Sequence, residues 1–160
     1  IKRKALMIKI NVISSDKIWF RYIKFPKKYI KNKIVKINKK YNKYRKKIFY
    51  CTLLLSGTSE IKKLNKRFRK KNKSTDVLSF PFYNKKDFLK KLRTEKEIYL
   101  GDIIINFNKV ISKKNKPSFL IKFDNLWIHG LTHLFGYDHK KNKDFKVMEQ
   151  VEKELMSYIN

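Results

Sequence analysis

The chain has 160 residues, the length of one ordinary domain, which is enough to bury a hydrophobic core. Hydrophobic residues make up 42% of it and aromatic residues 14%, which excludes a disordered chain, and no apolar run approaches the roughly 20 residues that a membrane-spanning helix needs. The net charge of +29 favours a polyanionic partner, above all the phosphate backbone of nucleic acid, although a genome with AT-rich codons also raises lysine content without any such selection.

The first third of the chain is predicted to form a strand, a helix and a second strand. Residues 5–13 alternate in part and are β-branched, which is typical of a strand. Residues 26–44 begin with proline and carry isoleucine and valine at near-helical spacing, which predicts an amphipathic helix. Residues 48–55 form an apolar run, which we interpret as a buried strand. Cys51, the only cysteine, lies in this run, so we expect a buried structural thiol and no internal disulfide.

The middle of the chain is predicted to contribute one helix and two further strands. Thr58 or Ser59 is a suitable N-cap for a helix that runs to about residue 69. Residues 76–82 are short, apolar and contain a proline, a combination typical of an edge strand. Residues 99–107 predict another strand, interrupted early by a glycine.

Two helices are predicted at the C-terminal end. Residues 117–135 place Trp127, Leu131 and Leu134 on one side at 3.6 residues per turn, which indicates a largely buried helix. A last helix over residues 144–158 is predicted from its apolar stripe, which consists of Phe145, Met148, Val151 and Leu155. Strands and helices in this number and order indicate one α/β or α+β layer fold.

All three histidines of the chain lie within eleven residues, at His129, His133 and His139. The first two are four residues apart, so on a helix both imidazoles project from the same face. Gly136 tolerates the left-handed backbone that ends a helix in a sharp turn, and this turn can bring His139 back toward the other two. Three neutral nitrogens about 2.0–2.1 Å from one Zn²⁺, with a fourth position open for water, form a catalytic zinc site.

Other metal sites with this pattern have to be weighed. Structural zinc normally takes four protein ligands and often cysteine, whereas Cys51 is remote in sequence. Three imidazoles also suit nickel or copper, so the metal is inferred as zinc rather than fixed by the sequence. The spacing resembles the metzincin proteases, which carry Glu directly after the first histidine as general base. Gly130 stands there in this chain and accepts no proton, which argues against peptide hydrolysis by that mechanism.

Four stretches of the sequence carry a more specific resemblance. The metal motif at residues 129–139 reads HGLTHLFGYDH. Residues 64–81 contain Leu-Asn, an arginine and the run TDVLSFP, residues 101–103 read Gly-Asp-Ile, and residues 148–152 contain Met-Glu and a second Glu. In order and spacing these stretches are similar to the YbeY-type rRNA maturation endoribonucleases, and the similarity covers about residues 48–156.

This resemblance implies a compact α+β fold, with a small mixed sheet, about four to five helices and a zincin-like metal helix, in which residues 1–160 form a single catalytic domain. It also implies a cytoplasmic enzyme with one Zn²⁺ that cleaves single-stranded RNA. The expected substrate is precursor 16S rRNA at its 3′ end, in small-subunit biogenesis and ribosome quality control. The small ribosomal subunit or its associated proteins are therefore expected partners, and no membrane is.

Arg69 is the expected catalytic residue, because the arginine of the family motif falls on it and a guanidinium suits phosphate. Without the resemblance, its place in a basic run favours a solvated helix end. Asp138 is suited to orienting an imidazole, capping the turn or contacting solvent, and Asp76 to capping or to pairing with Arg69. RNA contacts are expected from basic and aromatic neighbours, which include Lys66, Lys70, Lys71, Lys73, Phe82 and Tyr83.

Two other functions stay open from the residues alone. A metallohydrolase of another substrate class, such as a peptide or a small phosphoester, needs a replacement for the missing Glu if its substrate is a peptide. A non-catalytic, ribosome-associated RNA-binding protein keeps its RNA binding after loss of His133. A nuclease instead loses its activity with His129→Ala or His133→Ala while keeping much of its salt-dependent binding.

Overall fold

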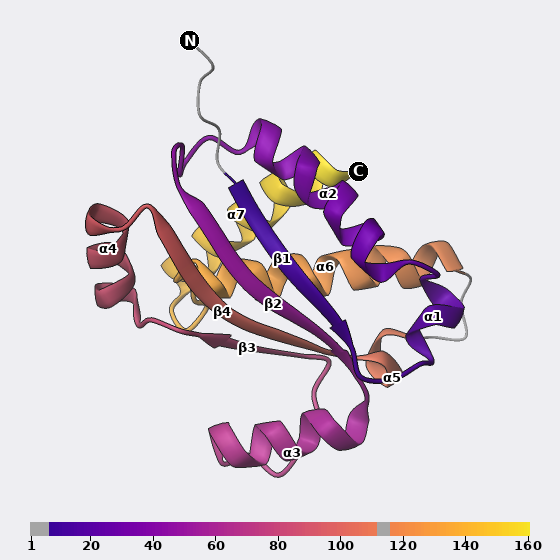
Figure 1. Cartoon of the computed structure of the whole chain (residues 1–160). Helices are drawn as coiled ribbons and strands as arrows, with labels where there is room; N and C mark the ends of the chain where they lie inside the picture. The colour runs from indigo at the N-terminus through magenta and orange to yellow at the C-terminus, as the bar shows by residue number, and fades with distance from the viewer. Residues whose placement is uncertain (1–6, 112–115) are drawn as a thin grey trace.

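The computed structural model of the chain describes residues 7–111 and 116–160. Its sheet contains the four strands β1 (Met7–Ser14), β2 (Ile48–Ser56), β3 (Val77–Pro81) and β4 (Glu97–Asn106), in the order β1-β2-β4-β3 (Figure 1). The β1–β2 and β2–β4 pairs are parallel, and β3 is antiparallel to β4. The mixed sheet and the position of β3 at its edge are confirmed.

Seven helices accompany the sheet within the described residues: α1 (Trp19–Tyr22), α2 (Pro26–Lys40), α3 (Thr58–Arg69), α4 (Lys85–Thr94), α5 (Phe107–Val110), α6 (Lys116–Leu134) and α7 (Asn142–Ile159). Two of them, α1 and α5, are single turns of four residues, so five longer helices remain, and the expected α+β class is confirmed. The sequence reasoning missed α4, whose N-cap Asn84 accepts a hydrogen bond from the backbone N–H of Asp87.

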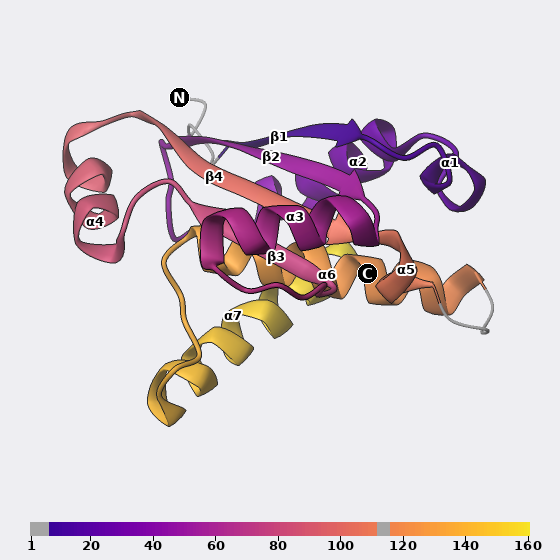
Figure 2. The same ribbon diagram turned by 90° about the horizontal axis from the view of Figure 1, so that it is seen from below.

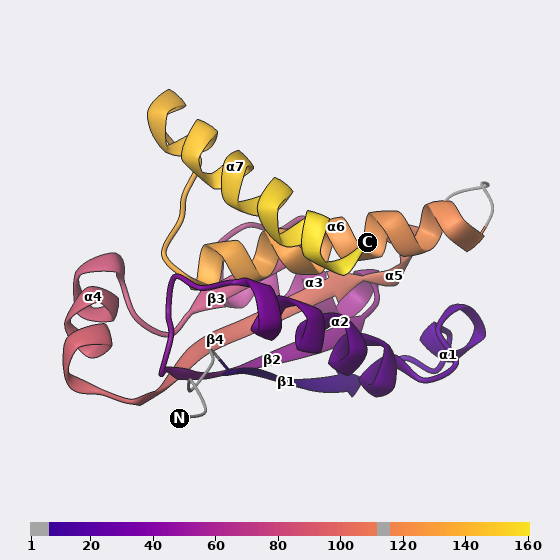
Figure 3. The same ribbon diagram turned by 90° about the horizontal axis from the view of Figure 1, so that it is seen from above.

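The main core lies between the sheet and the helices α2 and α6, which cover one of its faces, and α7 packs against both helices (Figure 3). Trp127, Leu131 and Leu134 of α6 are buried there, as their spacing predicted. The predicted stripe of α7 is wrong at its first residue, because Phe145 is 52% exposed. Figure 3 shows that the N-terminal turns of α7, which include residue 145, project away from α6.

A second, smaller apolar cluster lies on the opposite face of the sheet, where α3 packs (Figure 2). The predicted cap of α3 is wrong. Gly57 is the N-cap and has extended backbone, and no side chain caps the helix. The Thr58 hydroxyl instead bonds to the amide side chains of Asn106 and Asn108 at 3.3 and 3.0 Å, which ties the start of α3 to the end of β4.

A glycine bulge shapes β4 beside the site. Tyr50 pairs with Tyr99 but Cys51 pairs with Gly101, so one extra residue of β4 stands between the two pairs. Gly101 has a φ of +131°, and a Cβ on it would lie 2.1 Å from the backbone oxygen of Phe80. The glycine that was expected to interrupt this strand therefore allows β3 and β4 to approach each other closely.

Buried polar groups tie the main helices together. Asp124 on α6 is 3% exposed, and its carboxylate accepts hydrogen bonds from the Tyr29 hydroxyl at 2.9 Å and the Trp127 indole at 2.8 Å. The ammonium group of Lys33 lies 3.3 Å from the same carboxylate. These contacts fix α6, the helix that carries two of the histidines, against α2. In the described part of the chain, no helix has the length and apolar character needed to cross a membrane.

Candidate metal centre

The C-terminal end of α6 presents His129 and His133 one helical turn apart, with both side chains half-buried. The helix ends in a Schellman turn, in which the N–H of Tyr137 bonds to the Thr132 carbonyl and the N–H of Gly136 bonds to the His133 carbonyl. Gly136 has a φ of +88°, in the left-handed region that favours glycine. The predicted turn at Gly136 is thus confirmed.

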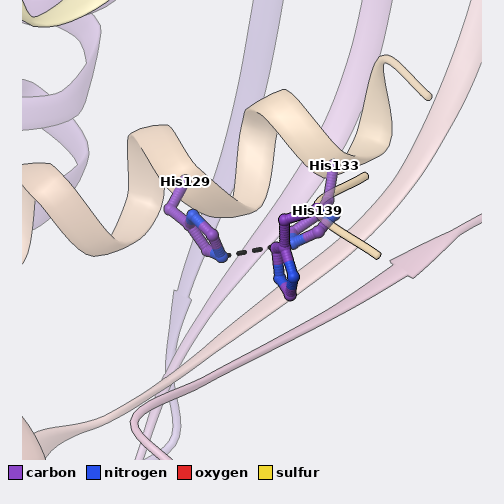
Figure 4. A group of neighbouring side chains, drawn as sticks. All are labelled: His129, His133 and His139. Carbon is purple, nitrogen blue, oxygen red and sulfur yellow. Dashed lines mark hydrogen bonds between the residues drawn. The ribbon is translucent and has the colours of Figure 1, made fainter. Parts of the chain in front are cut away.

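This turn brings the third histidine to the first two. One ring nitrogen each from His129, His133 and His139 lies within 4.8 Å of the others (Figure 4). The ring of His139 is 5.8 Å from that of His129 and 5.1 Å from that of His133, measured between centroids. His139 is exposed, so the group opens toward solvent on its side. The three residues that the sequence singled out do meet at one point.

His129 and His133 each form a hydrogen bond through Nδ1. These two bonds determine which ring nitrogen faces the point where the three histidines meet. The Nδ1 atom of His133 lies 2.9 Å from the backbone oxygen of Tyr137, and the Nδ1 atom of His129 lies 2.6 Å from a carboxylate oxygen of Glu152. Both partners are acceptors, so each Nδ1 carries the hydrogen. In the neutral form of either ring the Nε2 atom then carries the lone pair, and the two Nε2 atoms lie 3.2 Å apart (Figure 4).

The protonation of His133 agrees with this arrangement. Burial, followed by the neighbouring charge of His129, lowers the pKa of His133 below its ordinary value, although the bond to the Tyr137 carbonyl acts in the opposite direction. A lowered pKa keeps the imidazole neutral at physiological pH, and a neutral imidazole is the form that coordinates a metal ion.

The donor set fits a metal ion. When both imidazoles are neutral, their Nε2 lone pairs face each other at 3.2 Å, and a cation between them relieves the repulsion. Two nitrogens held about 2.0–2.1 Å from a tetrahedral ion are about 3.4 Å apart, close to the distance seen here. Three imidazoles without a cysteine or carboxylate in the group leave a fourth position open, which suits a catalytic rather than a closed structural site.

Packing explains why glycine follows the first histidine. A Cβ on Gly130 would lie 2.6 Å from the Cγ2 atom of Ile103 on β4 and 3.2 Å from the hydroxyl of Ser79 on β3. The helix thus approaches the sheet closely at this residue. A glutamate at this position would have no room, so the arrangement lacks the general base of the metzincin proteases for a steric reason as well as a chemical one.

The three histidines lie in an open cleft of about 1150 Å³. Arg69, at the end of α3, lines the same cleft, so the fold brings the expected catalytic residue to the cleft of the metal group. Positive charge around the cleft also comes from Lys85, Lys140 and Lys141, which the sequence reasoning did not name. Of the expected RNA contacts, Tyr83 lines the cleft, whereas Lys66, Lys70, Lys71 and Lys73 are exposed outside it.

The acidic residues near the site have separate roles. Asp138 accepts a hydrogen bond from the backbone N–H of His139 at 2.7 Å, so it shapes the turn. Asp76 accepts a bond from the backbone N–H of Val77 at 2.8 Å, and no ion pair joins it to Arg69 in the described residues. The carboxylate that orients an imidazole belongs to Glu152, and sequence spacing could not find it because α7 returns to the site 23 residues after His129.

Comparison with known proteins gives one consistent result. A family model described as "Endoribonuclease YbeY" matches residues 16–160. An endoribonuclease YbeY of Pelagibacter ubique is 44% identical over 96% of this chain and 97% of its own length. An endoribonuclease YbeY of Ehrlichia canis is 36% identical over 96% of this chain and 93% of its own length.

A solved structure supports the fold independently. The solution structure of a Thermotoga maritima protein superposes with a TM-score of 0.51 at 22% sequence identity. It covers 94% of this chain and 89% of that protein. At this identity the match speaks for the architecture of the sheet and helices, and the chemistry has to be argued from the residues of the cleft.

Proposed function

The chain belongs to the endoribonuclease YbeY family, and on that premise we propose that it is a metal-dependent endoribonuclease that cleaves single-stranded RNA. The observation that carries the proposal is the meeting of His129, His133 and His139 in the cleft that Arg69 also lines. Donors for one metal ion and a guanidinium for phosphate are the groups that phosphodiester hydrolysis needs.

A metal ion bound by the three histidines would supply Lewis acidity and lower the pKa of a bound water molecule. The residues of the chain prepare the site for it. Glu152 and the Tyr137 carbonyl hold the two imidazoles of α6 in the orientation that presents their Nε2 atoms. Arg69 binds the phosphate and stabilises the negative charge that develops on it during cleavage.

The choice of RNA over peptide rests on three features. Gly130 stands where a metzincin protease has its base, and Ile103 leaves no room for a larger side chain there. The net charge of +29 favours a phosphate backbone. The cleft also carries Lys85 at the start of α4 and Lys140 and Lys141 after His139, where they can contact phosphates.

The finer parts of the proposal follow from the family. We propose zinc as the resident metal, precursor 16S rRNA as the substrate at its 3′ end, and small-subunit biogenesis and ribosome quality control as the process. The cytoplasm is then the place of action, and the small ribosomal subunit or its associated proteins are the partners. The zincin-like character of the metal helix and the assignment of residues 1–160 to one catalytic domain also stay proposals.

The test is cleavage of single-stranded precursor rRNA by the purified protein, with and without a chelator, beside His129→Ala prepared identically. We expect cleavage that the chelator abolishes, that added zinc restores and that the variant lacks. A double-stranded RNA of the same sequence should resist. Equal cleavage by both proteins would identify a contaminating nuclease. RNA binding without cleavage by the metal-loaded wild type would instead favour a non-catalytic ribosome-associated protein.

A further inference from the structure

The face of the sheet opposite α6 and α7 is only partly covered. α3 packs over one end of it, where Ile61 lies against Leu78 and Ile104 (Figure 2). Beyond that cluster Lys9 on β1 and Tyr99 on β4 are exposed, and Tyr50 on β2 is half-buried. Large apolar side chains on an exposed sheet face indicate a binding surface rather than core packing.

The sheet register places aromatic residues side by side on this open face. Lys9 pairs with Tyr50, and Tyr50 pairs with Tyr99, so the three lie across β1, β2 and β4. Phe82 extends the row, because its backbone N–H donates to the Leu100 carbonyl one residue beyond β3. The rings of Phe82 and Tyr99 are 5.7 Å apart. We call Tyr50, Tyr99 and Phe82 the aromatic row.

The aromatic row is both accessible and held in place. Phe82 is 64% exposed and Tyr99 is 37% exposed. The Tyr99 hydroxyl donates to a carboxylate oxygen of Asp102 at 2.6 Å and lies 3.1 Å from the Thr52 hydroxyl, so its ring is fixed on the sheet. A ring that is already fixed loses little conformational freedom when a ligand stacks on it.

Cations stand at the ends of this surface. The ammonium group of Lys9 lies 5.6 Å from the centre of the Tyr50 ring. Toward α3, the exposed ring of Phe68 lies 5.5 Å from Phe80 and 5.2 Å from the guanidinium of Arg67. The carboxylate of Asp102 lies within this surface and accepts a hydrogen bond from Tyr99. The flanking cations, Lys9 and Arg67, are therefore the groups that can contact RNA phosphates.

We propose that the aromatic row binds single-stranded RNA by stacking its bases, at a site separate from the metal cleft. The inference rests on the proposed function in that it takes the same RNA as the ligand. Four-stranded sheets that stack two or three bases on exposed aromatic residues are a recurring way of binding single-stranded RNA. Basic residues beside stacking rings, on a chain of net charge +29, favour RNA over an acidic peptide strand.

β3 connects the aromatic row to the cleft. Its residues alternate, so Val77, Ser79 and Pro81 line the cleft while Phe80 points to the other face. Tyr83 lines the cleft too, and its ring lies 4.9 Å from that of Phe82. Because β3 is the edge of the sheet, an RNA strand that leaves the aromatic row at Phe82 passes over this edge and enters the cleft at Tyr83.

The test measures the binding of a fluorescent single-stranded RNA of about twelve nucleotides by anisotropy, with a chelator present so that no RNA is cut. We expect Phe82→Ala and Tyr99→Ala each to weaken binding about fivefold to a hundredfold, since each removes a stacking ring. Tyr99→Phe keeps the ring but loses the bonds of the hydroxyl, so its loss should be much smaller than that of Tyr99→Ala. Phe25→Ala is the matched control, because Phe25 is 62% exposed but lies beside β1, at the opposite edge of the sheet.

An abasic oligonucleotide of equal length separates stacking from charge. It keeps the phosphates, so we expect the wild type and Phe82→Ala to bind it equally weakly. Circular dichroism confirms that each variant is folded. An equal loss on both oligonucleotides, or wild-type affinity in Phe82→Ala, overturns the proposal and leaves the face to a protein partner.

The binding test of the aromatic row and the cleavage test of the nuclease proposal can fail separately. If the protein fails to cleave RNA but its binding depends on Phe82 and Tyr99, the aromatic row stands and the nuclease proposal fails. If chelator-sensitive cleavage is found and Phe82→Ala binds and cleaves normally, the nuclease stands and the aromatic row fails.

Discussion

Glu152 accepts the Nδ1 hydrogen of His129 at 2.6 Å, and this bond connects the middle of α7 to the C-terminal part of α6. Both side chains are about a third exposed, so the bond lies at the border of the cleft rather than in the core. Its effect is to fix the imidazole tautomer, because a carboxylate on one ring nitrogen leaves the lone pair of the other free for a metal ion.

Glu152→Ala should weaken metal binding about tenfold to a hundredfold, since loss of such a partner lets the ring rotate and lowers its basicity. Competition with a chromogenic chelator measures the change in affinity. Glu152→Gln keeps an acceptor for the Nδ1 hydrogen, so we expect a smaller loss.

Glu149→Ala is the control for that measurement, because Glu149 lies one turn earlier on α7 and pairs with Lys153 at 3.2 Å. It should bind metal like the wild type. Wild-type affinity in Glu152→Ala would mean that the histidines are positioned by the helix alone.

The grouping of the three candidate metal ligands could be predicted from the sequence because its signals are local. His129 and His133 are one helical turn apart, and Gly136 marks the turn that returns His139. Local periodicity also predicted most strands and helices. Glu152 could not be identified as a partner of His129 in this way, because its contact depends on the packing of α7 against α6.

The errors have the same origin. The cap of α3 was wrong because Thr58 finds amide partners at the end of β4, a contact between distant segments. α4 was missed because it has only ten residues, of which Phe88, Leu89 and Leu92 are its apolar ones, and Phe88 is its one buried residue. Long-range packing overrides weak local signals at both positions.

Arg69→Ala should lower kcat for RNA cleavage about a hundredfold to a thousandfold, as loss of a group that stabilises transition-state charge does. Its metal content should not change, because the proposed metal donors are the three histidines. Arg69→Lys should recover only part of the rate, since an ammonium group lacks the two-pronged geometry of guanidinium on phosphate. Single-turnover cleavage with excess protein gives the rate.

Arg67→Ala controls for general loss of positive charge. Arg67 is also exposed near the end of α3 but is absent from the cleft lining. We expect it to cleave like the wild type once RNA is bound. An equal loss in both variants would assign Arg69 to overall charge rather than to the reacting phosphate.

Cys51 gives a prediction about pH. Burial, followed by the charge of Asp102, raises the pKa of its thiol from 9.0 to about 12. Below pH 9 the Cys51 thiol keeps its proton in both the folded and the unfolded state, so its ionisation does not affect the free energy of unfolding. As the pH rises from 9 toward 12 the thiol ionises first in the unfolded state, and the free energy of unfolding falls. A thiol reagent at pH 8 should leave the native protein unmodified and react fully in denaturant.

The pH dependence of unfolding checks the same thiol. Between pH 8 and pH 10 the wild type should lose about 1 kcal/mol more unfolding free energy than Cys51→Ala, in which this ionisation is absent. Rapid modification of the native protein at pH 8 would show that β2 opens locally and would contradict the burial of Cys51.

Gly130→Ala tests the close approach of α6 to the sheet. The added methyl group would lie 2.6 Å from the Cγ2 atom of Ile103, so the helix or the strand has to shift. Overpacking of this kind costs about 1–3 kcal/mol, and the better helix propensity of alanine offsets about 1 kcal/mol of it. We expect a net loss of up to about 2 kcal/mol in the free energy of unfolding, measured by urea denaturation.

A second substitution at Ile103, the residue that the added methyl group would contact, tests whether this contact causes the loss. In the double variant Gly130→Ala with Ile103→Ala the clashing atom is gone, so the loss should be smaller than the sum of the two single losses by about 1 kcal/mol or more. Gly57→Ala is the matched glycine control, because a Cβ there lies at 3.4 Å from the Asp16 carboxylate, an ordinary contact. Additive losses in the double variant would mean that Gly130 is not held by Ile103, and the steric argument against a glutamate at this position would fail with it.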